Sequence, residues 1–108
     1  MADWTEEEKV RIWNKAERCG EKNEEKGFRK DCCGAWIKRD AYGDRDSRYG
    51  WEIDHIEPSS KGGDDIISNA RPLHWKNNAS RQNNKLKTIV TAKEDKNILV
   101  DTGKEFNP

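Results

Sequence analysis

Large apolar side chains are scarce in this sequence, and their scarcity limits the core that the chain is able to build. Leu, Ile, Val and Phe supply only 16 of the 108 residues, whereas charged residues make up 39%. Such a chain with a high net charge would be disordered, but here 21 basic residues balance 21 acidic ones and five tryptophans are present. The composition therefore predicts one small domain over residues 1–108, with a core anchored by Trp36, Trp51 and Trp75.

The sequence contains no apolar run long enough to span a membrane, and no stretch typical of an export signal. Its three cysteines are an odd number, which does not suit a disulfide framework. These features predict a cytoplasmic protein with reduced thiols and no membrane contact. We expect Cys32 to be a buried thiol.

Local patterns predict a mixed α+β architecture. Thr5 and Glu8 form a capping-box pattern, which predicts an N-terminal helix over residues 3–19. Trp4 and Trp13 are expected to pack this helix on the domain rather than to stack on bases. The other expected elements are a polar connection at 20–30, strands at 34–39 and 51–56 paired as a hairpin, a glycine-rich loop at 58–65, a polar helix at 75–85, and β-prone runs at 88–91 and 98–100 before a loose tail.

Basic residues are concentrated in one segment, although the chain as a whole is neutral. No acidic residue occurs between Asp65 and Glu94. An uninterrupted basic segment favours contact with phosphate groups over a purely solubilising role. The candidate nucleic-acid-binding residues are Arg71, Lys76, Arg81 and Lys85.

Four polar residues between Trp51 and Asn78 have the chemistry of a hydrolytic site. Thirteen residues separate His55 from Asn69, and eight separate Asn69 from Asn78. Histidine accepts a proton near neutral pH. Asp54 and Asn78 offer hard oxygen ligands, which suit Mg²⁺ or Mn²⁺ better than Zn²⁺. A base beside one such ion is typical of phosphodiester hydrolysis, and Asn69 has both a donor and an acceptor to tie the loop to the strand.

The segment WEIDHIEPSSKGGDDIISNARPLHWKNN resembles the core motif of the HNH endonucleases of the ββα-metal superfamily, in the variant with Asn at the third motif position. The resemblance covers about residues 31–85 and leaves out the N-terminal helix and a C-terminal extension at 86–108. It implies a ββα-metal fold, in which a β-hairpin and a crossing loop precede a metal-presenting helix.

Position by position, the resemblance also implies roles for the motif residues. His55 and Asn69 are the expected catalytic residues, the first as the general base and the second as the residue that orients the loop. Asp54 and Asn78 are the expected ligands of one Mg²⁺ or Mn²⁺ ion. The implied activity is a metal-dependent endonuclease that nicks DNA with weak sequence specificity, as a monomer or weak homodimer; RNA is not excluded.

The sequence departs from the common HNH pattern in two places. The paired cysteines that bind zinc in many relatives are replaced, first by Cys32 and Cys33 and then by His74 and Asn77, so no structural zinc is expected. Asn77 and Asn78 are alternative metal ligands, and spacing favours Asn78. Neighbouring strand residues point to opposite faces, so placing the adjacent Asp-His pair in one site requires a bend or bulge at residues 56–58.

Two other classes of protein are alternatives to a nuclease. One is a nucleic-acid-binding module that keeps the fold without cleaving, as part of a larger assembly. The other is a zinc-stabilised interaction domain using Cys19, Cys32, Cys33 and His74, but its ligand spacing is poor.

Overall fold

The computed structural model describes residues 3–57, 66–81 and 85–108. Helices and strands both occur, which confirms the α+β class. The elements are α1 (Glu6–Trp13), α2 (Glu21–Glu25), β1 (Phe28–Lys30), β2 (Trp36–Lys38), η1 (Arg39–Ala41), β3 (Trp51–His55), η3 (Ile67–Asn69), β4 (Ala70–His74), α3 (Trp75–Ala79), β5 (Val90–Lys93) and β6 (Lys96–Leu99). Within these ranges the strands form three antiparallel pairs, β1–β2, β3–β4 and β5–β6. None of the described helices is long and apolar enough to cross a membrane.

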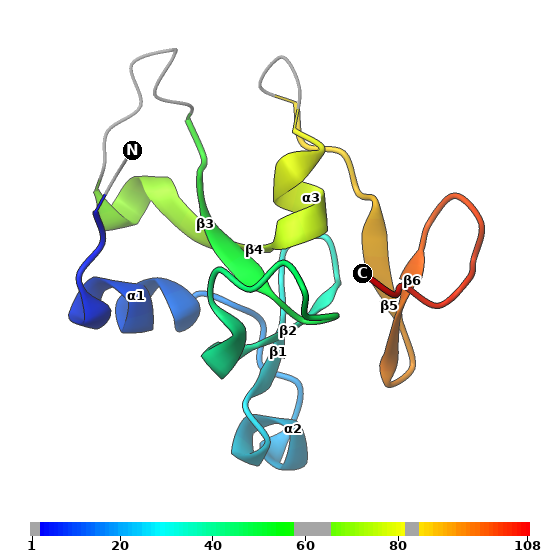
Figure 1. The fold of residues 1–108 in the computed structure, drawn as a ribbon. Coiled ribbons are helices and arrows are strands. Elements are labelled where there is room, and N and C mark those ends of the chain that lie inside the picture. The colour runs from blue at the N-terminus through cyan, green and yellow to red at the C-terminus, as the bar shows by residue number, and fades with distance from the viewer. Residues whose placement is uncertain (1–2, 58–65, 82–84) are drawn as a thin grey trace.

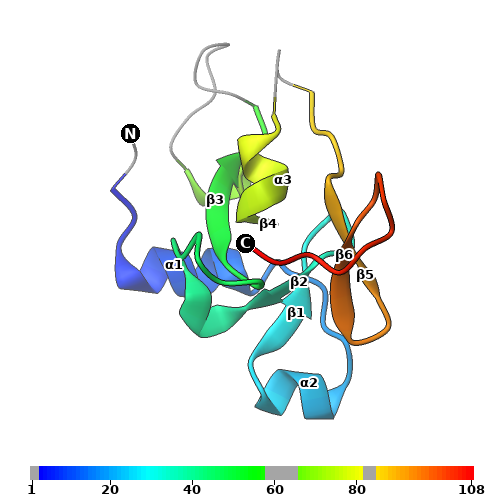
Figure 2. The ribbon, with the colours of Figure 1, turned by 45° about the vertical axis from the view of Figure 1, so that its right-hand side comes forward.

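The centre of the fold is the β3–β4 pair, with α1 on one side and α3 on the other (Figures 1 and 2). Trp51 lies opposite His74, and His55 lies opposite Ala70. The α3 helix begins directly after β4. In chain order this unit is therefore strand, strand and helix, with residues 56–69 connecting the two strands.

The predicted hairpin between residues 34–39 and 51–56 is wrong. The partner of β3 is β4, while β2 pairs with β1. The β4 strand contains Pro72, and proline has no N–H to donate to a ladder. In the described part of the chain β4 pairs only with β3, so its other edge tolerates the missing donor.

The first helix begins as predicted but is shorter than residues 3–19. Thr5 and Glu8 make the reciprocal hydrogen bonds of a capping box, which confirms this prediction. The α1 helix ends at Trp13 because Glu17 exchanges two backbone hydrogen bonds with Lys30, at 2.8 and 3.0 Å, and so must be extended. This long-range pairing outweighs the local preference for helix.

The last helix also begins as predicted and ends early. The α3 helix starts at Trp75 and ends at Ala79, not at residue 85. The Ser80 hydroxyl donates to the carbonyl of Asn77 at 2.7 Å and to that of Lys87 at 3.0 Å. Ser80 therefore links the end of α3 to the segment that leads into β5.

The core consists of two small clusters in which aromatic rings supply much of the buried area. One cluster joins α1 to the centre through Trp13 and Trp51, whose ring centroids are 5.2 Å apart. The other contains Ala35, Val90 and Phe106, with Trp75 partly buried against it. Trp36, Trp51 and Trp75 thus pack into the core region as expected.

The C-terminal segment is more ordered than predicted. The two β-prone runs form the β5–β6 hairpin, as expected. The loose tail is a wrong prediction, because Phe106 is buried and its N–H donates to Asn97 O at 2.8 Å. The buried Asn97 side chain also exchanges two hydrogen bonds with the backbone of Trp36. These bonds fix the hairpin to β2.

Candidate functional site

The two faces of β3 separate the predicted site residues. Glu52 bonds to Asn78 and Asp54 bonds to Arg81, so these side chains face α3 and the residues just after it. On the other face, the rings of His55 and Trp4 have centroids 6.1 Å apart. The pairing with β4 runs from residue 51 to 55 without a bulge, and Pro58 of the expected bend lies outside the described residues. Asp54 and His55 are thus adjacent in sequence and on opposite faces.

Asp54 is almost fully buried and is held by two arginines. Its Oδ2 accepts from Arg71 Nε at 2.8 Å, and its Oδ1 accepts from Arg81 Nη1 at 2.5 Å. Arg81 also donates to the carbonyls of His55 and Ile56. The Arg81 guanidinium therefore braces the end of β3, while its Nε is buried without a hydrogen-bond partner.

The side chain of Asn78 is oriented by the carboxylate of Glu52, a residue that the sequence motif did not indicate as part of the site. Its Nδ2 donates to Glu52 Oε1 at 2.8 Å. Glu52 in turn accepts two hydrogen bonds from the Arg45 guanidinium, at 2.7 and 2.9 Å. Burial raises the pKa of Glu52, but the hydrogen bonds from Arg45 and Asn78, together with the charge of Arg45, lower it further, so its pKa lies below the usual value. Because an ionised carboxylate only accepts, the amide nitrogen of Asn78 must face Glu52 and its oxygen must face elsewhere.

The neighbouring Asn77 has a different environment. It is fully buried, and its Nδ2 donates to Asp31 Oδ2 at 3.1 Å and to Val90 O at 3.0 Å. Its Oδ1 accepts from the backbone N–H groups of Ile89 and Val90, both at 2.8 Å. All four hydrogen-bonding positions of this amide are used inside the fold. Of the two asparagines, only Asn78 has an amide oxygen available to face a ligand.

The side chain of Asn69 links the two ends of the connection between β3 and β4. Its Oδ1 accepts from the N–H of Glu57 at 2.8 Å, and its Nδ2 donates to the carbonyl of Glu57 at 3.0 Å. It thus bonds the start of β4 to the residue two positions after His55. The glycine pair Gly62–Gly63, which it was expected to hold, lies outside the described residues.

His55 and Asn78 line the same cavity despite facing different sides of β3. This cavity has a volume of about 360 Å³. It lies beside β3, which contributes Glu52, Ile53 and His55 to its lining, whereas α3 contributes Asn78. The lining residues are Trp4, Tyr42, Gly43, Arg45, Glu52, Ile53, His55 and Asn78.

The second histidine, His74, is a structural residue. Its side chain is fully buried, its Nδ1 accepts from the N–H of Lys76 at 3.0 Å, and its Nε2 lies 2.8 Å from the carbonyl of Arg48. An imidazole that accepts at Nδ1 and donates at Nε2 is neutral. Burial lowers the pKa of His74, although the Arg48 carbonyl and the carboxylates of Asp31 and Glu52 act in the opposite direction.

This buried histidine predicts that the fold loses stability in mild acid. Since the pKa of His74 is lower in the folded chain, stability is complete above the ordinary histidine pKa of about 6.5 and falls as the pH drops through it, by at most about 1.4 kcal/mol per pH unit. Urea unfolding at pH 7.5 and pH 5.5 measures this loss. The loss should persist in His55→Ala and shrink in His74→Gln. An equal loss in the parent and His74→Gln would contradict the assignment to His74.

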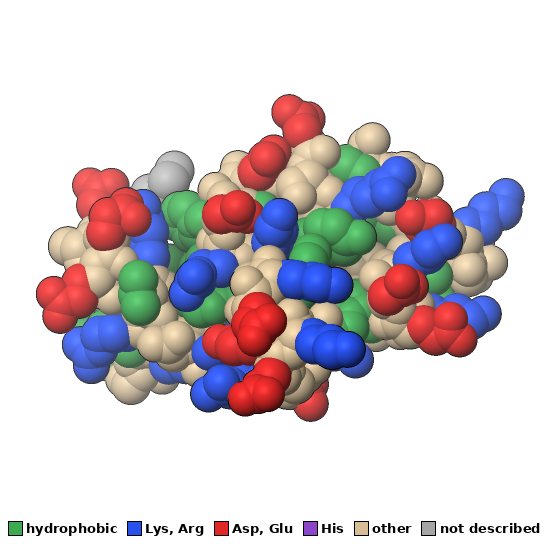
Figure 3. Space-filling model, turned by 90° about the horizontal axis from the view of Figure 1, so that it is seen from below, with side chains coloured by type: hydrophobic (Ala, Val, Ile, Leu, Met, Phe, Trp, Pro, Cys, Tyr) green, Lys and Arg blue, Asp and Glu red, His purple; other side chains and the backbone are tan. Residues whose placement is uncertain are grey.

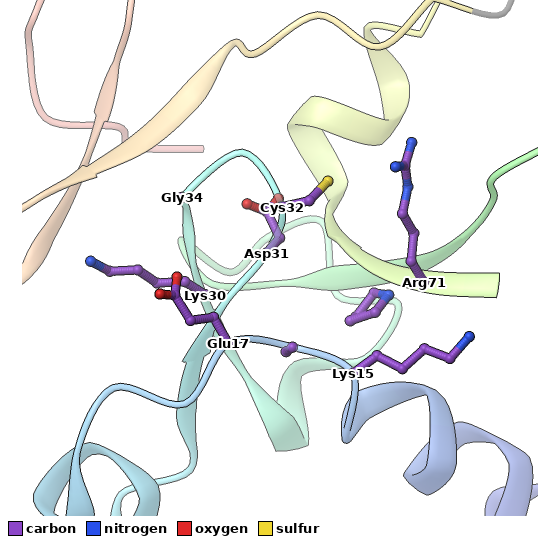
Figure 4. A pocket seen from close by; sticks show the side chains of 9 residues that line it. Lys15, Glu17, Lys30, Asp31, Cys32, Gly34 and Arg71 are labelled. Atoms are coloured by element: carbon purple, nitrogen blue, oxygen red, sulfur yellow. The ribbon is translucent and has the colours of Figure 1, made fainter. Parts of the chain in front are cut away.

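A second pocket, of about 310 Å³, lies beside Cys32 and Arg71 (Figure 4). Cys32 is exposed, so the prediction that it is buried is wrong; it follows Asp31, whose side chain takes the buried position in this turn. A hydrogen bond from Cys33 lowers the pKa of Cys32 to about 7. Lys15, Lys30 and Arg71 point in three different directions around the pocket, so they do not form a cradle for an anion.

The expected nucleic-acid-binding residues have different surroundings. Arg71 and Arg81 are bound to Asp54, and the Arg81 side chain is only 13% exposed. Lys85 is exposed, and Lys76 lies over the ring of Trp75. On the face seen from below in Figure 3, acidic and basic side chains are interspersed. That face has no continuous basic surface that would attract a phosphate backbone.

The side-chain oxygens of Asp54 and Asn78 are of the type that a hard divalent cation prefers. Asp54 offers carboxylate oxygens and Asn78 an amide oxygen, both from the side of β3 that faces α3. In the described part of the chain, no three His, Cys, Asp or Glu side chains converge to hold a metal. A cation at Asp54 competes with Arg71 and Arg81 for the same oxygens.

A family model described as HNH endonuclease matches residues 17–84, which is more than half of the chain. The match includes the whole segment from Trp51 to Asn78 and confirms the resemblance inferred from that segment. Comparisons with curated proteins and with solved structures gave no match.

Proposed function

The chain belongs to the HNH endonuclease family, and we propose that it is a divalent-metal-dependent endonuclease that nicks DNA with weak sequence specificity. The family implies a nucleic-acid substrate and nuclease activity. The observation that carries the proposal is the cavity beside β3, because His55 and Asn78 line it together although they come from different elements. An imidazole can act as a general base and an oriented amide oxygen as a metal ligand in phosphodiester hydrolysis.

In this mechanism, His55 takes a proton from a water molecule, and the water oxygen bonds to phosphorus. The bond from phosphorus to the 3′ oxygen then breaks, and that oxygen takes a proton from solvent, leaving a 5′ phosphate and a 3′ hydroxyl. Asn69 holds the chain after His55 through its two bonds to Glu57. HNH nucleases generally use a divalent metal, which Asp54 and Asn78 would hold here and which would stabilise the negative charge that develops on the phosphate.

One site in a chain of 108 residues cuts one strand per event. Supercoiled plasmid incubated with Mg²⁺, Mn²⁺, Zn²⁺ or EDTA therefore tests the proposal. We expect open circles to accumulate before linear DNA with Mg²⁺ or Mn²⁺, and intact plasmid in EDTA. Linear DNA without prior open circles would contradict nicking. Intact plasmid with every metal, together with a gel shift, would favour the non-cleaving binding module.

The hydrogen bond between Asn78 and Glu52 predicts that Glu52 affects metal binding indirectly, by orienting the amide of Asn78. Glu52→Gln replaces the acceptor of Asn78 with a group that also donates, so the amide of Asn78 is no longer held in one orientation. Loss of such a supporting contact typically costs about 10- to 100-fold in metal affinity or activity. We expect the metal concentration for half-maximal cleavage to rise by about this factor.

The matched control is Glu25→Gln, the same change at the exposed end of α2. It should leave the metal requirement unchanged. An identical metal dependence in Glu52→Gln and Glu25→Gln would show that Glu52 does not orient Asn78.

A further inference from the structure

The cavity beside β3 is lined by residues that have no part in the proposed chemistry as well as by His55 and Asn78. Besides His55 and Asn78, its lining includes two aromatic residues, Trp4 and Tyr42. Trp4 precedes α1 and lies outside residues 17–84, which match the HNH family model. Neither aromatic residue has a part in the proton transfer or the metal site described above.

Both aromatic rings are held in place and still line the cavity. The Trp4 ring is half-buried, and its centroid lies 6.1 Å from that of His55. The Tyr42 ring packs edge-on against Trp51 at 4.9 Å and remains 39% exposed. Trp4 was expected only to pack α1 on the domain, but it lies against the proposed general base.

Charges of both signs lie near the two aromatic residues. Glu6, Glu7 and Glu8 follow Trp4 in the first turn of α1, whereas the Nζ of Lys9 lies 4.6 Å from the centroid of the Tyr42 ring and Arg45 lines the cavity. A nucleobase carries no charge and has a flat face. Aromatic side chains stack on such faces in proteins that bind single strands, and this stacking tolerates any base.

We propose that Trp4 and Tyr42 form a subsite for an unpaired nucleobase next to the phosphodiester that is cut. The location of that phosphodiester beside His55 rests on the proposed function. A base reaches a protein ring only after it leaves its own stack, so the preferred substrate has single-stranded, frayed or branched DNA at the cleavage point. The site therefore selects DNA by its structure rather than by its sequence.

Binding measured without metal tests this subsite independently of cleavage. The probes are a fluorescent thymidine octamer and an octamer of the same length in which tetrahydrofuran abasic units replace all the bases. In EDTA, we expect the parent protein to bind the thymidine octamer about tenfold more tightly. Trp4→Ala should reduce this ratio towards one by weakening only the thymidine octamer, and Trp4→Phe should keep most of it.

The control is Val10→Ala, at an exposed apolar position on α1, which should keep the full ratio. A parent ratio of one would overturn the proposal. A Trp4→Ala protein that keeps the ratio, or that binds both octamers equally more weakly, would also overturn it. Because no metal is present, failure of the plasmid assay leaves this result unaffected, so the two proposals fail separately.

Discussion

Replacing His55 with alanine is expected to slow plasmid cleavage by about 100- to 10,000-fold, the usual contribution of a general base. The side chain is half-buried at the rim of the cavity, so its loss removes little core packing. Binding of the thymidine octamer in EDTA should be within about threefold of the parent, because phosphate and base contacts remain. Initial rates of open-circle formation at saturating Mg²⁺ or Mn²⁺ measure the effect.

The matched control for this change is Ile56→Ala, at the next position, whose side chain is 45% exposed. It shortens a side chain beside the site without removing a titratable group. A His55→Ala protein that keeps more than about a tenth of the parent rate would exclude His55 as the general base. Thermal unfolding of both variants shows whether a lost rate reflects lost structure.

The adjacent asparagines are expected to have opposite phenotypes. Asn77→Ala removes the side-chain partner of the Val90 carbonyl and of the N–H groups of Ile89 and Val90, while Asp31 Oδ2 keeps the N–H of His74. A buried polar group that is left unsatisfied costs about 1–3 kcal/mol. We expect Asn77→Ala to lower the free energy of unfolding by about 3 kcal/mol or more, a large share of the total for a domain of this size. Asn78→Ala removes one side-chain bond, and Glu52 keeps Arg45.

Urea unfolding and plasmid cleavage of the two variants measure this contrast. Asn78→Ala should stay within about 1 kcal/mol of the parent stability and lose metal-dependent cleavage. Asn77→Ala should unfold at lower urea concentration. An Asn77→Ala protein with parent-like stability and no cleavage, beside an active Asn78→Ala protein, would transfer the metal-ligand role to Asn77.

Local signals in the sequence correctly predicted the features that have local causes. The capping box at Thr5 and the start of α3 at Trp75 depend on residues within one helical turn. The β5–β6 hairpin joins two neighbouring β-prone runs through a short turn. The ends of both helices were missed, because Glu17 and Ser80 are bonded to segments distant from their own helices.

Strand pairing was the main error, and its cause is tertiary. The predicted pairing joins residues 34–39 to β3 through a long loop at 40–50, whereas the true partner β4 contains Pro72 and follows β3 after residues 56–69. The buried polar side chains were also missed as core residues. Asp and Asn residues usually lie on the surface. Asp31 and Asn97 are buried instead, and each accepts hydrogen bonds from backbone N–H groups.

By itself, the sequence determined the family and the candidate chemistry, because the types and spacing of His55, Asn69 and Asn78 are characteristic of the HNH motif. Only the tertiary structure decided which asparagine is committed to the core. Consecutive residues on a helix point about 100° apart, and the direction that is buried depends on what packs there. For Asn77 this is the backbone of Val90 and the carboxylate of Asp31, whereas Asn78 faces a carboxylate on β3. Segments distant in the sequence supply these partners, so local spacing could not reveal them.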